Sequence, residues 1–237
     1  MQRNLKKVFF VKNKMIIFGN TNLADLANYY FEHDGNYQVS AFVVDDEFYD
    51  TESFCDKPVV PFSKMLVEYP PEQYDLFVAV GYTNQNRTRE NLYYRCKKMG
   101  YTLPSYVSSK ATVFDTLKVG DNCFILEDNT IQPFAVIGND VVLWSGNHIG
   151  HHAVIEDHCF ITSHVVVSGG VHVGRNCFIG VNTSIRDHIS IGNHCLIGAG
   201  SWIHKNTEPY GIYSNEGTKR VREVEKNDKM GKARADF

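Results

Sequence analysis

Aliphatic side chains recur at every sixth position along the second half of the chain. The series runs without a miss from Val107 to Ile203. A period of six fits neither the 3.6-residue repeat of a helix nor the alternation of a simple strand. Because one residue in six must return to the same interior, the pattern predicts a three-sided solenoid whose coils each contain three hexads.

Four cysteines keep the register of this ladder. Cys123, Cys159, Cys177 and Cys195 each lie four residues after an aliphatic position, at separations of 36, 18 and 18 residues. In a coil of three hexads they would stack on one side of successive coils, where a tight corner needs a small side chain. We therefore predict that they are reduced, buried packing residues rather than disulfides or ligands.

The first half of the chain alternates short apolar runs with segments of helical spacing. This alternation favours strands separated by helices, and hence a parallel sheet. A polar loop and a segment bounded by Pro58 and Pro61 follow the second strand, and Asn22 is the expected N-cap of the first helix. The predicted strands cover residues 15–19, 38–44 and 74–81, and the predicted helices cover residues 22–31, 62–68 and 87–99.

These patterns predict an α/β Rossmann-like domain followed by an all-β parallel solenoid. The first domain lacks the G-x-G-x-x-G fingerprint after its first strand, so we do not expect it to bind NAD. The predicted organisation is an N-terminal extension (1–14), the Rossmann-like domain (15–105), the solenoid (106–205) and a C-terminal tail (206–237).

Composition narrows the range of partners. A net charge of −3 over 237 residues gives no electrostatic reason to expect nucleic acid or an anionic membrane as partner. No apolar run is long enough to span a membrane, and the apolar stretch after the basic N-terminus is too short for a signal peptide. We predict a cytoplasmic protein.

Three segments of the repeat carry a family resemblance. Residues 137–140, 173–180 and 191–200 have the I-G-x-x-x-small pattern and resemble the left-handed β-helix of hexapeptide acyltransferases. With the Rossmann-like domain before it, the chain resembles the sialic-acid O-acetyltransferase-like family, which includes N-acetyltransferases of nucleotide-linked amino sugars. The resemblance implies a homotrimer with inter-subunit active sites, acetyl-CoA between neighbouring β-helices, and the sugar nucleotide on the N-terminal domain.

Histidines are the candidate catalytic groups. Nine of the ten lie between residues 148 and 204, and we expect them at corners and outer faces because the aliphatic core has no room for them. By register, the base histidine of the family falls on His151, with His152 and His164 as weaker candidates. Imidazole accepts a proton near neutral pH, which suits an amine attacking a thioester. The resemblance therefore implies direct transfer, with no covalent enzyme intermediate.

The sequence departs from the family motif around this histidine. Gly150 stands where the family has a glutamate before the base, and His152 stands where it has an acidic residue after it. The second histidine of the family is Phe160 here. The group that orients His151 stays open at this point, and the candidates, from this or a neighbouring chain, are Glu127, Glu156 and Asp157.

Residues for the cofactor and the acceptor follow from the same resemblance. Gly180, Gly198 and Ala199 keep the late coils smooth for the pantetheine arm of CoA, and Lys219 and Arg220 are candidates for its 3′-phosphate. In the first domain, the helix after the first strand can receive a phosphate at its N-terminus. The candidate residues for the sugar nucleotide are Gly19, Asn20, Thr21, Asp45, Asp46, Gly81, Tyr82 and Thr83.

The sequence thus predicts an acetyl-CoA-dependent N-acetyltransferase that acts on a nucleotide-linked amino sugar for a surface glycan. Sugar O-acetylation is the nearest alternative. A zinc enzyme like the β-helix carbonic anhydrases is a second; His152 and His188 share its spacing, but its third histidine is missing, so no metal site is predicted. A non-catalytic scaffold is a third. The residues do not determine the nucleotide or the sugar.

Overall fold

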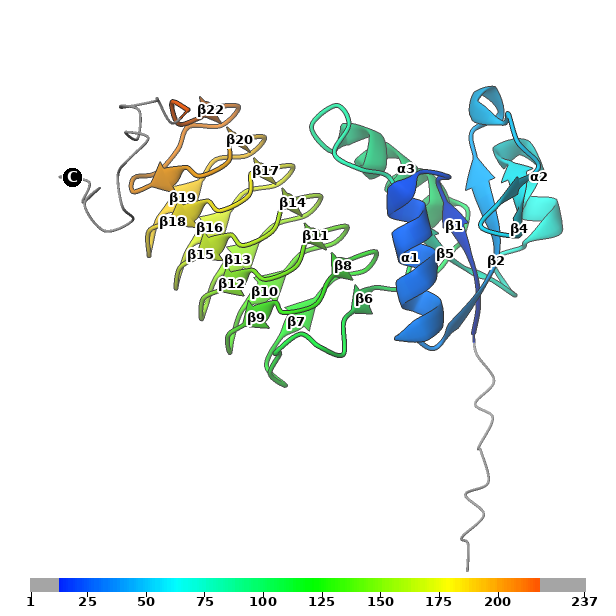
Figure 1. The fold of residues 1–237 in the computed structure, drawn as a ribbon, viewed down its shortest axis with the longest axis horizontal. Coiled ribbons are helices and arrows are strands. Elements are labelled where there is room, and N and C mark those ends of the chain that lie inside the picture. The colour runs from blue at the N-terminus through cyan, green and yellow to red at the C-terminus, as the bar shows by residue number, and fades with distance from the viewer. Residues whose placement is uncertain (1–12, 218–237) are drawn as a thin grey trace, which may run out of the picture.

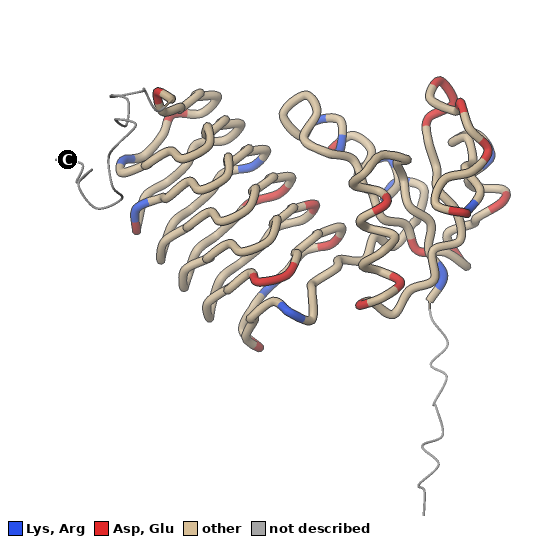
Figure 2. The backbone as a smooth tube through the Cα atoms, in the orientation of Figure 1, with Lys and Arg blue, Asp and Glu red and all other residues tan. Residues whose placement is uncertain are grey.

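The structure, a computed structural model, describes residues 13–217. An α/β domain stands at one end of a stack of triangular coils (Figure 1). The coil faces are largely uncharged, and charged residues gather at the turns between short strands (Figure 2). Among the described residues, no helix is both long and apolar enough to cross a membrane. The candidate residues Lys219 and Arg220 lie outside the described range.

The N-terminal domain is a five-stranded sheet with order β3-β4-β2-β1-β5. The strands β1, β2, β4 and β5 are parallel, and only β3 runs antiparallel to its neighbour. The three predicted strands and three predicted helices are confirmed to within a few residues. The elements are β1 (Asn13–Phe18), α1 (Asn22–His33), β2 (Tyr37–Val44), η1 (Asp46–Phe48), β3 (Ser53–Phe54), β4 (Lys57–Pro61), α2 (Phe62–Glu68), β5 (Asp75–Val78) and α3 (Arg87–Lys98).

Two local details differ from the sequence analysis. The segment between Pro58 and Pro61 belongs to strand β4, which pairs with β2. Both prolines stand near the ends of that strand, where a missing N–H costs little. Asn22 is the first helical residue of α1, and the N-cap is Thr21, whose side chain makes no capping hydrogen bond.

The second domain is a three-sided parallel β-helix. Paired strands from β6 to β21 are 18 residues apart, as Val136 is from Val154, which confirms three hexads per coil. The last pair differs, because Leu196 of β20 pairs with Ile212 of β22. We name the three faces sheet I (β6, β8, β11, β14, β17, β20, β22), sheet II (β9, β12, β15, β18, β21) and sheet III (β7, β10, β13, β16, β19). Their bounds are β6 (Tyr106–Val107), β7 (Lys118–Val119), β8 (Phe124–Ile125), β9 (Thr130–Ile131), β10 (Val136–Ile137), β11 (Val142–Leu143), β12 (His148–Ile149), β13 (Val154–Ile155), β14 (Phe160–Ile161), β15 (Val166–Val167), β16 (His172–Val173), β17 (Phe178–Ile179), β18 (Ser184–Ile185), β19 (Ser190–Ile191), β20 (Leu196–Ile197), β21 (Trp202–Ile203) and β22 (Ile212–Tyr213).

The ladder of aliphatic residues fills the interior of the β-helix. Positions from Ile125 to Ile203 on the ladder are buried in one continuous cluster. Val113 is an exception: it lies outside any named strand in the first, incomplete coil and is 40% exposed. The four cysteines of the ladder are free and buried in this cluster, as predicted. Cys159, for example, donates its S–H to the carbonyl of Gly174 at 3.1 Å.

The N-terminal domain packs on the outer face of sheet I. Along this sheet, the residue before each buried aliphatic is often aromatic, as at Tyr106, Phe124 and Phe160, and these side chains share one buried cluster with Phe31 and Phe77 of the N-terminal domain. The rings of Phe77 and Phe124 lie 5.5 Å apart. Burial of this apolar surface stabilises the docked arrangement. Phe160 therefore has a packing role between the two domains.

A buried ionic network also joins the two domains. Arg89 of α3 is 1% exposed and pairs with Asp140, whose carboxylate also contacts His158 at 2.8 Å. Arg89 donates further hydrogen bonds to the backbone carbonyls of Asp140, His158 and Cys159. The buried polar groups of Arg89, Asp140 and His158 all have hydrogen-bond partners. This network therefore holds α3 on the turns between sheets III and I. His158 stands at a corner of the coil, as expected for the histidines, but α3 covers it and buries it completely.

Candidate functional site

A pocket of about 740 Å³ opens at the carboxyl ends of β1, β2 and β5. In the sheet, β1 lies between β2, the next strand along the chain, and β5, the last strand of this domain. The strand order therefore reverses between β1 and β5. Open α/β sheets bind ligands at this point, because loops diverge there and leave a crevice. The pocket therefore lies where this topology favours a nucleotide.

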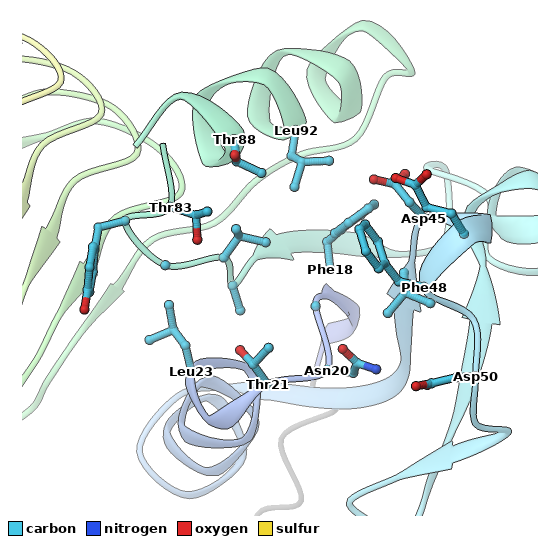
Figure 3. A pocket seen from close by; sticks show the side chains of 17 residues that line it. Phe18, Asn20, Thr21, Leu23, Asp45, Phe48, Asp50, Thr83, Thr88 and Leu92 are labelled. Carbon is cyan, nitrogen blue, oxygen red and sulfur yellow. The ribbon is translucent and has the colours of Figure 1, made fainter. Parts of the chain in front are cut away.

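Residues from distant parts of the chain line this pocket (Figure 3). Gly19 follows β1 with φ +122°, and a Cβ there would lie 2.8 Å from the carbonyl oxygen of Ala79. Only glycine allows this close approach of β1 and β5. Seven of the eight residues that we selected for the sugar nucleotide line the pocket: Gly19, Asn20, Thr21, Asp45, Gly81, Tyr82 and Thr83.

Asp46 is the candidate that the structure places elsewhere. Its carboxylate accepts the backbone N–H of Ser63 at 3.0 Å, so it supports the first turn of α2 instead of lining the pocket. Strand β2 ends just before it, and the short helix η1 turns its side chain away from Asp45.

Charge in the pocket is unevenly distributed. Asp45, Glu47 and Asp50 are its acidic residues, and none of the described lining residues is a lysine or arginine. Asp45 forms an ion pair with Arg95, which stacks on the ring of Phe62 at 3.8 Å. The remaining acids suit hydroxyl and N–H donors, as on ribose and bases. The first N–H groups of α1 have no intrahelical acceptor and offer a site for phosphate.

His151 and His152 occupy an exposed turn between sheets II and III, after β12. Nδ1 of His151 lies 3.2 Å from Nδ1 of His152, and Oε1 of Gln132 accepts the backbone N–H of His151 at 2.9 Å. His152 has φ +58°, and its ring packs against that of Phe134 in a tilted arrangement with ring centroids 4.9 Å apart. The turn therefore presents two imidazoles in direct contact on the surface of the β-helix.

The ring of His151 lies directly against Gly169 of the next coil. A Cβ at Gly169 would come within 2.7 Å of Nε2 of His151 and within 2.8 Å of its Cε1. The absence of a side chain at this position thus makes room for the imidazole. A glycine in the next coil therefore contributes to the position of the candidate base.

The acidic residues that we considered as orienting groups have other partners in the chain. Glu156 pairs with His172 at 3.0 Å, and Asp157 accepts the backbone N–H of Asn139 at 2.7 Å. Glu127 accepts hydrogen bonds from Tyr30 and Ser145. Burial opposes the ionisation of Glu127, but these two hydrogen bonds lower its pKa below its ordinary value. None of the three is placed beside His151 of the same chain.

His164 lies on a different edge of the β-helix. It occupies the turn between sheets I and II with φ +58°, and its ring lies against Gly146. A Cβ at Gly146 would come within 2.6 Å of Nδ1 of His164. The structure therefore does not bring His164 together with His151 in one chain.

The cofactor candidates lie along the same edge as His164. Gly180 is buried, and a Cβ there would lie 2.5 Å from the backbone nitrogen of Ala199, so this glycine lets successive coils stack. A Cβ at Gly198 would lie 3.1 Å from the Cβ of Ser214. Ala199 is exposed. Of these three residues, only Ala199 offers an open surface to a ligand.

The comparisons with known proteins agree with this architecture. Residues 134–169 and 170–205 match the model of the bacterial transferase hexapeptide (six repeats), and residues 152–187 match the hexapeptide repeat of succinyl-transferase. The matched residues, 134–205, lie within the β-helix and are similar to the hexapeptide repeats of bacterial transferases. No curated protein sequence matches the chain significantly.

Solved structures extend the similarity of fold to the N-terminal domain. A variant of perosamine N-acetyltransferase from Caulobacter crescentus, in complex with CoA and GDP-perosamine, is 22% identical, with 87% of this chain and 95% of that chain covered and a TM-score of 0.78. The acetyltransferase domain of PglB from Neisseria gonorrhoeae, in complex with acetyl coenzyme A, is also 22% identical, with coverage of 86% and 97% and a TM-score of 0.76. WeeI from Acinetobacter baumannii is 17% identical, with coverage of 84% and 96% and a TM-score of 0.71.

Several pocket residues were missed by sequence reasoning. Phe48 is the last residue of η1, Asp50 follows this short helix, and Thr88 and Leu92 belong to α3. Phe48 is 62% exposed although it is a large aromatic side chain. The available signal was its position four residues after the end of β2. The described residues contain no group of three histidine, cysteine or acidic side chains that would hold a metal ion.

Proposed function

We propose that the protein is an acetyl-CoA-dependent N-acetyltransferase that acts on a nucleotide-linked amino sugar. The main support is that seven residues selected from the sequence line one pocket, at the point where the strand order of the sheet reverses. The domain that holds this pocket packs on a β-helix of hexapeptide repeats. One structural neighbour was crystallised with CoA and GDP-perosamine, and another with acetyl coenzyme A. These ligands support acetyl-CoA as the acetyl donor and a nucleotide-linked amino sugar as the acceptor. The acetamido product would serve a surface glycan.

The pocket is proposed to hold the nucleotide portion of the acceptor. Phosphates lie at the N-terminus of α1, where backbone N–H groups and the helix dipole attract negative charge. Asp45 or Asp50 accepts hydrogen bonds from ribose or base, and Thr21 adds a hydroxyl. The volume of about 740 Å³ is in the range of small-molecule sites.

His151 is proposed to remove the proton from the sugar amine. The nitrogen lone pair attacks the carbonyl carbon of the thioester, and the N–H proton passes to Nε2 of His151. The tetrahedral intermediate then breaks its C–S bond, and the CoA thiolate leaves with the sugar nitrogen acetylated. A positioned base of this kind contributes about two to four orders of magnitude in rate.

The proposed reaction centre combines two chains. The pocket borders sheet I, where Tyr82 contacts Phe160 and Phe178 at ring distances of 5.2 and 4.8 Å. His151 stands on the edge between sheets II and III, which is the edge opposite sheet I in a three-sided coil. One chain therefore separates its pocket from its own His151. We propose a homotrimer in which each pocket faces the His151 of a neighbour, with acetyl-CoA between the β-helices.

A complementation experiment tests this arrangement. Gly81→Trp fills the pocket, because no atom lies within 4 Å of the added Cβ, and His151→Ala removes the base. Each variant alone is expected to be inactive. Co-assembled in equal amounts, they are expected to recover about one quarter of wild-type activity, because random mixing pairs an intact pocket with an intact histidine at that frequency. Mixtures as inactive as the separate variants would refute the shared site.

A second experiment tests the substrate class. Amino sugars linked to UDP, dTDP or GDP are incubated with acetyl-CoA, and the release of free thiol is followed. We expect turnover with one nucleotide class and none with the matched sugar whose amine is replaced by hydroxyl. Turnover of the hydroxyl compound alone would instead establish O-acetylation. Absence of turnover with all of them would overturn the proposal.

The contact between Gly169 and His151 gives a further prediction. Gly169→Ala places a methyl group where the imidazole lies, at 2.7 Å from Nε2, so the ring must move. The backbone needs no unusual φ at Gly169, and His151 is an exposed side chain, so we expect the fold to remain. A displaced base lowers kcat by about 10- to 100-fold.

The matched control for this prediction is a double variant. In a His151→Ala background, Gly169→Ala should lower kcat no further, because the ring that it displaces is gone. An additional loss in that background, or an unchanged kcat in the single variant, would contradict the proposed contact. Thermal unfolding of each variant reports whether the fold is intact.

A further inference from the structure

The two adjacent imidazoles constrain each other's protonation. Their Nδ1 atoms lie 3.2 Å apart, a distance at which one nitrogen must carry a hydrogen and the other must accept it. A neutral imidazole has one donor and one acceptor nitrogen, so this contact links the tautomer of His151 to that of His152. The pair is therefore a defined chemical unit rather than two independent histidines.

The backbone and one aromatic ring hold His152 in place. His152 has φ +58°. Phe134, at the same corner of the preceding coil, also lies in the left-handed region, with φ +67°. The backbone N–H of Phe134 donates to Oγ1 of Thr116 at 3.1 Å, and the ring of Phe134 packs against that of His152. A bulky residue in the left-handed region is uncommon and needs a surrounding structure that maintains it. This column thus supports the His152 ring from below.

Only one direction of the hydrogen bond leaves His151 able to act. If His151 donates from Nδ1, its Nε2 carries a lone pair and lies beside Gly169, where no side chain covers it. If His152 donates instead, Nε2 of His151 carries the hydrogen and accepts no proton. We propose that His152 is a positioning residue that accepts the Nδ1–H of His151 and so keeps Nε2 of His151 as the free base. This inference rests on the proposed function of His151.

The chemical consequence is a base with a neutral partner. A carboxylate beside a histidine stabilises the imidazolium by Coulomb attraction, whereas a neutral imidazole supplies a hydrogen bond without that charge. Around the pair, the preceding coil presents Gln132 and Phe134, and the next coil presents Gly169 and Gly170. The ring of His188, whose neighbour is Asp187, lies against Gly170 and is another titratable group on this edge.

Three variants of His152 separate positioning from mere structure. His152→Asn keeps an acceptor near the place of Nδ1 and suits the left-handed backbone, which Asn176 and Asn182 adopt at equivalent corners. His152→Gly keeps the backbone and removes the acceptor. His152→Asp replaces the neutral acceptor with a carboxylate. All three are assayed as the full chain with the amino-sugar nucleotide and acetyl-CoA, and their assembly is checked by size.

We expect His152→Gly to lower kcat about 10-fold or more with little change in KM, and His152→Asn to restore kcat to within about threefold of wild type. His152→Asp should move the acidic limb of the kcat pH profile to higher pH, because the carboxylate favours protonated His151. Equal kcat values and pH profiles in all three variants would overturn the positioning role.

A measurement without turnover keeps this inference separate from the proposed function. Nitrogen chemical shifts of the histidine side chains report which ring nitrogen carries hydrogen. In the wild type at alkaline pH we expect His151 to carry hydrogen on Nδ1, and in His152→Gly we expect a mixture of tautomers. A wild-type His151 with hydrogen on Nε2 would overturn the inference, whether or not the protein transfers acetyl groups.

Discussion

Replacing His151 with alanine is expected to lower turnover by about two to four orders of magnitude while leaving assembly and acetyl-CoA binding intact. The side chain is exposed, and its ring contacts His152 and Gly169. Its removal therefore leaves no cavity in the core and no buried polar group unpaired. What is lost is the proposed acceptor for the amine proton.

The measurement is steady-state release of free thiol, together with binding of acetyl-CoA by calorimetry. His188→Ala is the matched control, because His188 stands on the same edge, is exposed, and its ring also lies against a glycine. That glycine is Gly170, in the coil before His188. We expect it to keep turnover within about threefold of wild type. Wild-type turnover in His151→Ala would remove His151 as the base, and a large loss only in His188→Ala would relocate the site.

The largest expected effect on stability comes from Arg89. Arg89→Met keeps most of the apolar stem but leaves Asp140, which is fully buried, without its cationic partner. The backbone carbonyls of His158 and Cys159 also lose a donor. Removing one partner of a buried ion pair costs about 3–5 kcal/mol of the free energy of unfolding, because the remaining charge stays desolvated. We expect a large fall in the denaturation midpoint.

A second cation on the same helix provides the comparison. Lys97 pairs with Asp121, but their side chains are 41% and 31% exposed. Solvent screens this pair, so Lys97→Met should change the free energy of unfolding by about 0–1 kcal/mol. Equal losses from Arg89→Met and Lys97→Met in chemical denaturation would show that burial does not decide the energetics here. Asp140→Asn should also destabilise strongly, since Arg89 would then lack its carboxylate.

The β-helix was the part of the fold most accessible from sequence. Its interior takes one aliphatic residue from each hexad, so the pattern repeats locally and needs no knowledge of distant contacts. The buried cysteines followed from the same register. The α/β domain was also predictable in type, because strands and helices have different periods. The boundary details at Thr21 and β4 were less accessible, since capping and edge pairing depend on neighbours in space.

The candidate site was predictable only in part. The residues after β1 and β5 were found because strand ends of a parallel sheet meet at one edge. Asp46 was misplaced because the turn of η1, which the sequence did not reveal, sends its carboxylate to α2. Phe48 and Thr88 were missed because they reach the pocket from other elements. The burial of His158 was not predicted, because the helix that covers it, α3, belongs to the other domain.

Sequence by itself determined the coil, its 18-residue register and the exposed turn that carries His151, because each follows from a repeat that every hexad must satisfy. Only the tertiary structure decided which groups meet. It separated His151 from Glu127, Glu156 and Asp157, joined it to His152, and buried Arg89 with Asp140 between the domains. These pairings depend on side-chain directions and on contacts between coils and domains, which periodicity along the chain does not encode.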